Sequence, residues 1–166
     1  MSRRLVLATG NPHKVEELAA IVRAAGLALE VRSARSLGPA PAIAEDQGSF
    51  VAHALVKALG IAVWLKERGE PGATLVLADD SGLCVAALDG LPGVDSAIFA
   101  GPQGDDVANN AKLVAELRAR GLSESPAHYV CVLALTRVDG APLPALPGSE
   151  PGPSPAVRLF SGRWDG

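Results

Sequence analysis

The chain has 166 residues, of which 48% are hydrophobic and 20% charged, and its formal net charge is -3. This composition suits one folded domain with a buried core, and it excludes an intrinsically disordered chain. The negative net charge argues against binding to duplex nucleic acid, which favours a basic protein face.

Two further features predict a cytoplasmic protein that does not enter a membrane. No stretch approaches the roughly 20 apolar residues that span a bilayer, and the apolar run after Arg3 and Arg4 is too short for a secretory signal. The two cysteines, Cys84 and Cys131, lie far apart and have no metal-binding spacing. Such a pair is typical of buried thiols in a reducing compartment.

The chain opens with residues that predict a strand, a tight turn and a helix. Residues 5–8 are a short apolar run, which is typical of a buried strand. Thr9 and Gly10 break this run, Asn11 is a good helix N-cap, and Pro12 suits the first helical position. The helix ends at a C-terminal cap, Gly26, after apolar residues at helical spacing: Val15, Leu18, Ala19, Val22 and Ala25.

A second strand and helix and a third strand follow. Residues 29–31 predict a strand, and Ser49 caps a helix. Residues 74–78 predict the third strand, which is expected to end at Asp79-Asp80-Ser81-Gly82. The second helix has one apolar face, formed by Val51, Leu55, Ala58, Ala62 and Leu65.

The next segments complete an alternating pattern. Asp105 caps a third helix that runs through Arg120 and closes at Gly121. Residues 128–136 are mainly apolar and predict a long strand buried on both faces. Because strands alternate with helices, we predict an α/β fold.

The composition changes towards the end of the chain. Residues 139–156 hold six prolines and three glycines, which predicts a loop or linker. Residues 157–160 predict the start of one more strand. We therefore expect a folded domain over residues 1–138, a loop over 139–156, and the beginning of a further strand over 157–166, with the remainder of the domain absent.

The segment after the first strand has the features of an anion-binding turn. Thr9-Gly10-Asn11-Pro12-His13-Lys14 leads into a helix N-terminus, where free backbone N–H groups and the helix dipole attract phosphate. Gly10 allows close backbone approach, and Lys14 adds a point charge. The spacing is not that of a Walker loop. The alternative is an ordinary helix cap with a solvated lysine.

Two adjacent carboxylates follow the third predicted strand. Ligands in open α/β sheets bind beyond the carboxyl ends of strands, and Asp79 and Asp80 are expected at such an end. Carboxylates there hold Mg²⁺ together with substrate phosphates, and one of them can position or deprotonate water. The alternative is a plain Asp/Ser/Gly turn with capping side chains.

A third group of polar residues surrounds the start of the second helix. Glu45 and Asp46 precede the helix, and His53 and Lys57 lie four residues apart on one helical face. Lys57 is placed to reach a phosphate, and Glu45 to join a metal site. The alternative is an acidic loop, a solvated helix face and a structural His53. Residues 91–97 either border the site or form a plain connection.

In this order, the motifs resemble the inosine triphosphate pyrophosphatase family, the non-canonical purine nucleoside triphosphate pyrophosphatases. The resemblance covers residues 4–138 well and residues 160–166 weakly. It is sharpest at Ala78-Asp79-Asp80-Ser81-Gly82-Leu83, followed by Gly90-Leu91-Pro92-Gly93-Val94. Other matching residues include Leu5, Val6, Leu7, Ala8, Thr9, Gly10, Asn11, Lys14, Glu17, Glu45, Phe50, Ala54, Lys57, Ser96, Ala97, Asn110 and Cys131.

The resemblance implies a fold and a reaction. The fold is an elongated mixed α/β sheet flanked by helices, usually in a homodimer. The reaction is hydrolysis of inosine, deoxyinosine and xanthosine triphosphates (ITP, dITP and XTP) to the monophosphate and pyrophosphate, with Mg²⁺. By resemblance, Asp80 is the general base and a metal ligand, Glu45 the second metal ligand, Lys57 a phosphate contact and Ser81 a substrate contact. The triphosphate would bind along Thr9, Gly10, Asn11, Pro12, His13 and Lys14.

This sequence departs from the family pattern at several points. His53 stands where the family usually has Asn, and Ile98 where a basic residue usually follows the Ser-Ala pair. The family pattern continues past Gly166 with two blocks that carry most of the base recognition, so we expect a chain cut off before its last segment, with little activity and poor base selectivity. A fragment, a natural truncation and a frame error all stay open as its origin.

Two other functions compete with this interpretation. One is a nucleotide pyrophosphatase of the septum-inhibitor-like group, which has a similar fold. The other is an inactive nucleotide-binding or dimerisation module. The Asp-Asp-Ser-Gly-Leu block, residues 79–83, favours the first interpretation.

Overall fold

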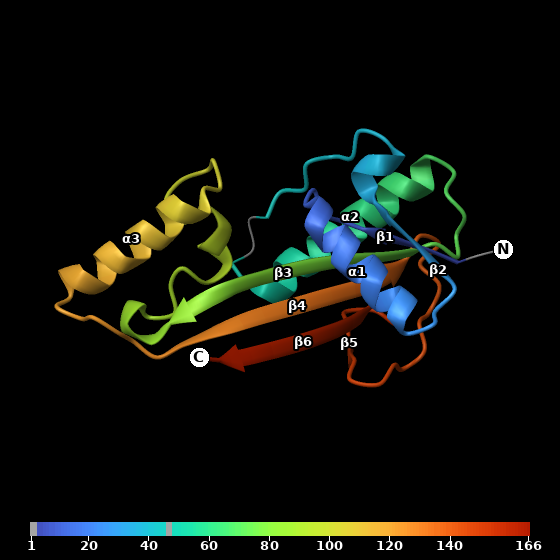
Figure 1. Cartoon of the computed structure of the whole chain (residues 1–166). Helices are drawn as coiled ribbons and strands as arrows, with labels where there is room; N and C mark the ends of the chain where they lie inside the picture. The colour runs from blue at the N-terminus through green and yellow to red at the C-terminus, as the bar shows by residue number, and fades with distance from the viewer. Residues whose placement is uncertain (1–2, 46–47) are drawn as a thin grey trace.

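The computed structural model describes residues 3–45 and 48–166, which form a six-stranded mixed sheet with helices on both sides (Figure 1). The strand order is β2-β1-β3-β4-β6-β5. β1 is parallel to β2 and β3, whereas β3, β4, β6 and β5 pair antiparallel in succession. The strands are β1 (Arg3–Leu7), β2 (Leu29–Ser33), β3 (Leu75–Val85), β4 (Ala127–Arg137), β5 (Glu150–Pro151) and β6 (Arg158–Asp165).

The helices begin at the caps expected from the sequence. The side chain of Asn11 accepts a hydrogen bond from the His13 N–H, that of Ser49 from Ala52, and that of Asp105 from Val107 and Ala108. The α-helices are α1 (Pro12–Ala24), α2 (Phe50–Glu67) and α3 (Asp106–Ala119), and the 3₁₀ turns are η1 (Ala34–Leu37), η2 (Ala86–Leu88) and η3 (Gly93–Ile98).

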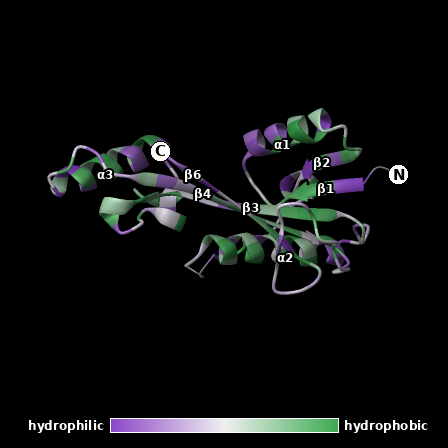
Figure 2. Ribbon diagram, turned by 90° about the horizontal axis from the view of Figure 1, so that it is seen from below, coloured by the Kyte–Doolittle hydropathy of each residue, from purple (hydrophilic) through white to green (hydrophobic). Residues whose placement is uncertain are grey.

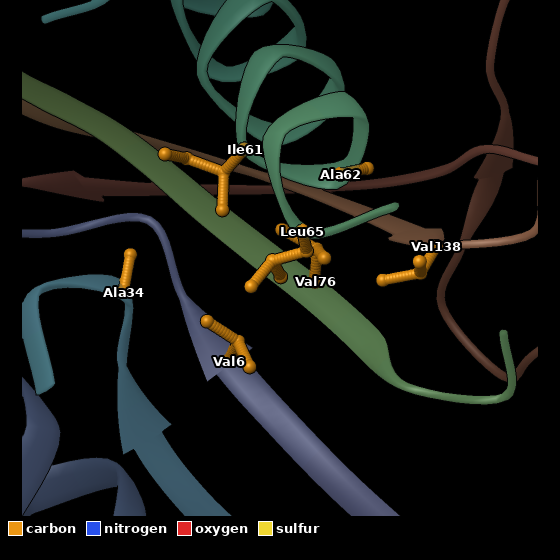
Figure 3. Close-up of a cluster of buried hydrophobic side chains, with 7 residues drawn as sticks. All are labelled: Val6, Ala34, Ile61, Ala62, Leu65, Val76 and Val138. Carbon is orange, nitrogen blue, oxygen red and sulfur yellow. The ribbon is translucent and has the colours of Figure 1, made fainter. Parts of the chain in front are cut away.

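α1 and α2 lie on opposite faces of the sheet, as the two perpendicular views show (Figures 1 and 2). Hydrophobic residues concentrate on β3 and α2 (Figure 2). The main core lies between them: Val6 of β1 and Val76 of β3 pack against Ile61 and Leu65 of α2, and all four side chains are buried (Figure 3). Further along α2, small residues allow the helix to approach the sheet closely: Ala54, Ala58, Ala78 and Ala134.

β3, β4 and β6 continue well past β1, towards the end of the molecule that carries α3 (Figure 1). The sheet is therefore long and mixed, as the resemblance implied. β6 pairs with β4 from His128 to Leu135, so the C-terminal strand belongs to the same sheet. The segment between β4 and β6 is mainly loop, although it contains the two-residue strand β5. The predicted division at residues 138 and 156 stays a prediction.

Two predictions about strands are wrong. β3 does not end at Ala78 but runs to Val85, because every residue from Leu75 onward is paired with β4. β4 is not buried on both faces. Alternate residues such as Val132 and Ala134 are buried under α2, whereas their neighbours are only half-buried.

Candidate functional site

The acidic block lies where β3 outruns its parallel neighbour. β1 pairs with β3 up to Leu7 and Leu77, and the Ala8 N–H donates the last hydrogen bond to the Leu77 carbonyl at 2.8 Å. Beyond this point β3 has no β1 partner, and Asp79 and Asp80 follow at once. The block is thus in the middle of a strand, not in a turn after one, yet it still sits beside the carboxyl end of a parallel strand, β1.

The two carboxylates point to opposite sides of the sheet, because successive side chains alternate along a strand. Asp80 faces α2, where the Lys57 Nζ donates a 2.9 Å hydrogen bond to its Oδ1. Asp79 faces α1 and pairs with Lys14. The alternative of a plain Asp/Ser/Gly turn is therefore wrong, because the block lies within β3.

Lys57 links the two predicted metal ligands. Its Nζ lies 2.9 Å from Asp80 Oδ1 and 3.1 Å from Glu45 Oε2, and its side chain is only 17% exposed. Burial by itself would lower the pKa of Lys57, but the hydrogen bond and charge of Asp80, with the charge of Glu45, outweigh it and raise the pKa above its usual value. Lys57 is therefore a partly buried, charged ammonium between two carboxylates.

His53 lies one turn before Lys57 and faces the same carboxylates. Its Nδ1 is 3.3 Å from Asp80 Oδ2 and 3.4 Å from Glu45 Oε2. The prediction of a solvated helix face is wrong here, because His53 is 6% exposed. Glu45, His53 and Asp80 bring three ligand atoms within 4.8 Å of one another, which fits a divalent cation. Asp46, the other acidic residue of the segment, lies outside the described residues.

Two adjoining cavities bring most of the predicted substrate residues together. The larger, of about 800 Å³, is lined by Asn11 and Ser81 among others, and the smaller, of about 480 Å³, by Thr9 and Gly10. The residues that line both are Lys14, Glu45, Lys57 and Asp79. A cavity of the larger size suits a small-molecule ligand. The residues of the predicted phosphate segment that line neither cavity are Pro12 and His13.

Gly82 allows η3 to form one wall of the larger cavity. A Cβ atom at position 82 would lie 2.1 Å from the Gly93 carbonyl oxygen, so only glycine lets the two backbones meet. The Ser96 hydroxyl accepts a hydrogen bond from the Leu83 N–H and donates one to the Gly93 carbonyl. Residues 92–98 therefore border the site.

Arg35 is a cation that the sequence analysis did not single out. It follows β2, and its guanidinium lies so close to Gly10 that a Cβ there would meet Cζ at 2.7 Å. Arg35 lines the smaller cavity with Thr9, Gly10 and Lys14. No local sequence signal marks it, because it reaches the site only through the pairing of β2 with β1.

Comparisons with known proteins agree with this architecture. The model of the Ham1 family matches residues 5–166. A protein of Opitutus terrae named dITP/XTP pyrophosphatase is 42% identical over 142 residues, which cover 83% of this chain and 66% of that protein. One of the same name from Bordetella parapertussis is 44% identical over 147 residues, which cover 87% of this chain and 63% of that protein. The match therefore spans less than two thirds of these relatives' length.

Solved structures show the same fold. A HAM1 protein from Coxiella burnetii superposes with a TM-score of 0.76 at 29% identity, over 99% of this chain and 72% of that one. A nucleoside-triphosphatase, dITP/XTP pyrophosphatase, from Mycobacterium abscessus superposes with a TM-score of 0.70 at 31% identity, over 98% and 71%. The family inferred from the sequence motifs is confirmed, and the chain belongs to the Ham1 family.

Proposed function

We propose that this chain carries the catalytic centre of a nucleoside triphosphate pyrophosphatase that acts on non-canonical purine nucleotides such as dITP, ITP and XTP. Asp80 supports this most directly. It is a buried carboxylate on the wall of a cavity of about 800 Å³, with a lysine on one oxygen and a buried, unpartnered second oxygen. The relatives named dITP/XTP pyrophosphatases give the substrate class.

The proposed reaction divides the work among the residues around Asp80. Water attacks the α-phosphorus, an O–P bond forms, and the bond from that phosphorus to the pyrophosphate oxygen breaks. When the substrate binds, the Lys57 ammonium transfers its hydrogen bond from Asp80 Oδ1 to a phosphate oxygen. Asp80 Oδ1 is then free to accept the proton of the attacking water. Lys14 and Arg35 neutralise the triphosphate along Thr9 and Gly10, and Ser81 contacts the substrate from β3.

A divalent cation completes the proposed centre, with Asp80 and Glu45 as its carboxylate ligands. We propose Mg²⁺ as the ion that enters with the triphosphate, since Mg²⁺ takes one or two carboxylates together with substrate phosphates. When bound, the cation withdraws charge from the phosphate oxygens. The unpartnered Asp80 Oδ2, which faces Glu45 and His53, fits such a ligand.

Homodimerisation and a cytoplasmic location stay predictions. Tyr129 of β4 and Trp164 of β6 are cross-strand partners, and they are 47% and 80% exposed. An exposed aromatic pair of this kind supports self-association. Light scattering of the unmodified chain against a Trp164→Glu variant tests the dimer, which the variant should weaken.

In the described part of the chain, no helix has the length and apolar character needed to cross a bilayer.

Pyrophosphate release tests the proposed function. The chain is assayed with ITP, XTP and ATP in the presence of Mg²⁺, beside Asp80→Asn and the control Asp165→Asn, whose side chain is 69% exposed. We expect a low rate of pyrophosphate release that vanishes with Asp80→Asn and survives Asp165→Asn, with little preference for ITP and XTP over ATP. Turnover that is independent of Asp80 would refute the proposed catalytic centre, whereas robust turnover selective for ITP and XTP would refute the expected poor base selectivity. The family match does not favour the septum-inhibitor-like alternative.

A further inference from the structure

Two buried polar atoms, one of them an oxygen of the proposed catalytic carboxylate, face each other without a hydrogen bond. Over residues 3–45 and 48–166, the buried side-chain atoms that lack a partner are His53 Nδ1 and Asp80 Oδ2. They lie 3.3 Å apart, and their residues are 6% and 9% exposed. Because an unpartnered buried polar group destabilises a folded protein, a ligand bound to both atoms would remove that penalty.

The spacing of the atoms matches ligands around one metal ion. Glu45 Oε2 lies 3.4 Å from His53 Nδ1, so both carboxylates are at nearly the same distance from this nitrogen. Metal–ligand bonds of about 2.0–2.2 Å place neighbouring ligand atoms about 3.0–3.4 Å apart. Neither contact has the geometry of a hydrogen bond, which a nitrogen that donates to a carboxylate would show.

Lys57 does not take the place of such an ion at Asp80. It occupies Oδ1, whereas Oδ2 is the oxygen that faces His53. The carboxylate oxygen that lies near both Lys57 Nζ and His53 Nδ1 is Glu45 Oε2. The lysine and a cation can therefore be bound at the same time, each on its own oxygen of Asp80.

The geometry points to His53 as a third metal ligand, which gives this site a preference for first-row transition-metal dications over Mg²⁺. Magnesium favours oxygen ligands, whereas imidazole nitrogen favours Co²⁺, Ni²⁺ and Zn²⁺. One imidazole nitrogen and two carboxylate oxygens form a mixed set of ligands, which favours these transition-metal ions over Mg²⁺. This inference rests on the proposed metal site but not on the proposed reaction, because it concerns ion binding without nucleotide.

The test is calorimetric titration of the nucleotide-free chain with Co²⁺ and with Mg²⁺. We expect tighter binding of Co²⁺ than of Mg²⁺ by the unmodified chain. His53→Asn keeps a polar side chain but removes the imidazole, and should weaken Co²⁺ binding by about 10- to 100-fold while Mg²⁺ affinity changes little. His128→Asn, a histidine of β4 outside the cluster, should leave both affinities unchanged. Equal Co²⁺ affinity in the unmodified and His53→Asn chains would overturn the inference, as would an unmodified chain that binds no Co²⁺.

A second measurement needs no variant at this position. Electron spin-echo modulation of Mn²⁺ bound to the unmodified chain reports a directly coordinated nitrogen, which we expect to see in the His128→Asn background as well. Absence of that nitrogen coupling would exclude His53 as a ligand. A chain that binds Co²⁺ through His53 but hydrolyses no nucleotide would keep this inference and refute the proposed function. Hydrolysis with Mg²⁺ in a chain that shows no nitrogen coupling would support the proposed function and refute this inference.

Discussion

Asp79 and Asp80 are neighbours in the chain, yet their carboxylates pair with lysines on opposite faces of the sheet: Asp79 with Lys14 of α1, and Asp80 with Lys57 of α2. The alternation of side chains along β3 causes this separation. Because β3 outruns β1 at this point, both carboxylates still line the same cavity. The two residues therefore have different proposed roles.

Neutralising the two carboxylates should have unequal effects on hydrolysis. Asp80→Asn removes the proposed proton acceptor and is expected to lower kcat for ITP by about 100-fold or more. Asp79→Asn only releases Lys14 and should cost about 10-fold or less, since Lys14 remains available to phosphate. Steady-state pyrophosphate release measures both. Equal losses in two folded variants would show that the assignment of roles is wrong.

Removing the partly buried Lys57 should destabilise the fold. Lys57→Met leaves the charges of Asp80 and Glu45 without their ammonium. Because Lys57 is partly buried and Glu45 is 38% exposed, we expect a loss below the about 3–5 kcal/mol of a fully buried pair but above that of an exposed one. Lys14→Met is the matched control, because the Lys14 side chain is 41% exposed and an exposed pair contributes about 0–1 kcal/mol. Urea unfolding compares the two free energies. We also expect Co²⁺ to stabilise the Lys57→Met chain more than the unmodified chain, since it restores positive charge. Losses of similar size in both variants would contradict the role given to burial.

A methyl group at Gly82 should displace the wall of the cavity. Its Cβ would lie 2.1 Å from the Gly93 carbonyl oxygen, so η3 must move away from β3. A displacement of about 1 Å at a reacting site costs on the order of 100-fold in rate. Gly162→Ala on β6 is the control, because nothing lies within 4 Å of a Cβ at that position. If the Gly82→Ala and Gly162→Ala variants release pyrophosphate at the same rate, η3 does not position the substrate.

The reactivity of Cys131 should report the charge of Asp79. Burial raises the pKa of the Cys131 thiol, and the negative charge of Asp79 raises it further, whereas Lys14 lowers it. At any pH below this raised pKa, Asp79→Asn should increase the thiolate fraction and hence the rate of alkylation. The pH–rate profile with iodoacetamide in a Cys84→Ala background measures the shift. Asp165→Asn should leave the profile unchanged, and an unchanged profile in Asp79→Asn would place the carboxylate away from the thiol.

The sequence alone determined the helix starts, the α/β class and most residues of the candidate site. Asn11, Ser49 and Asp105 cap helices through hydrogen bonds that span two or three residues, so the signal is local. The family motifs at residues 9–14 and 79–83 likewise needed no structure to be seen. Asp80 was selected from the second motif, and Glu45 and Lys57 from the residues around the second helix that match the family; the structure brings the three together.

Only the tertiary structure decided how these residues are used. The length of β3 depends on hydrogen bonds to β4, a strand far along the chain, so no local signal could show that the acidic block lies within a strand. The burial of His53 and the partial burial of Lys57 depend on the small alanines that let α2 approach β3 and β4. The separation of Asp79 from Asp80, and the approach of Arg35 to Gly10, likewise follow from strand pairing. Strand pairing and helix packing join residues that are distant in sequence, whereas caps and motifs join neighbours. The sequence therefore predicted the caps and motifs but not the strand pairing or the helix packing.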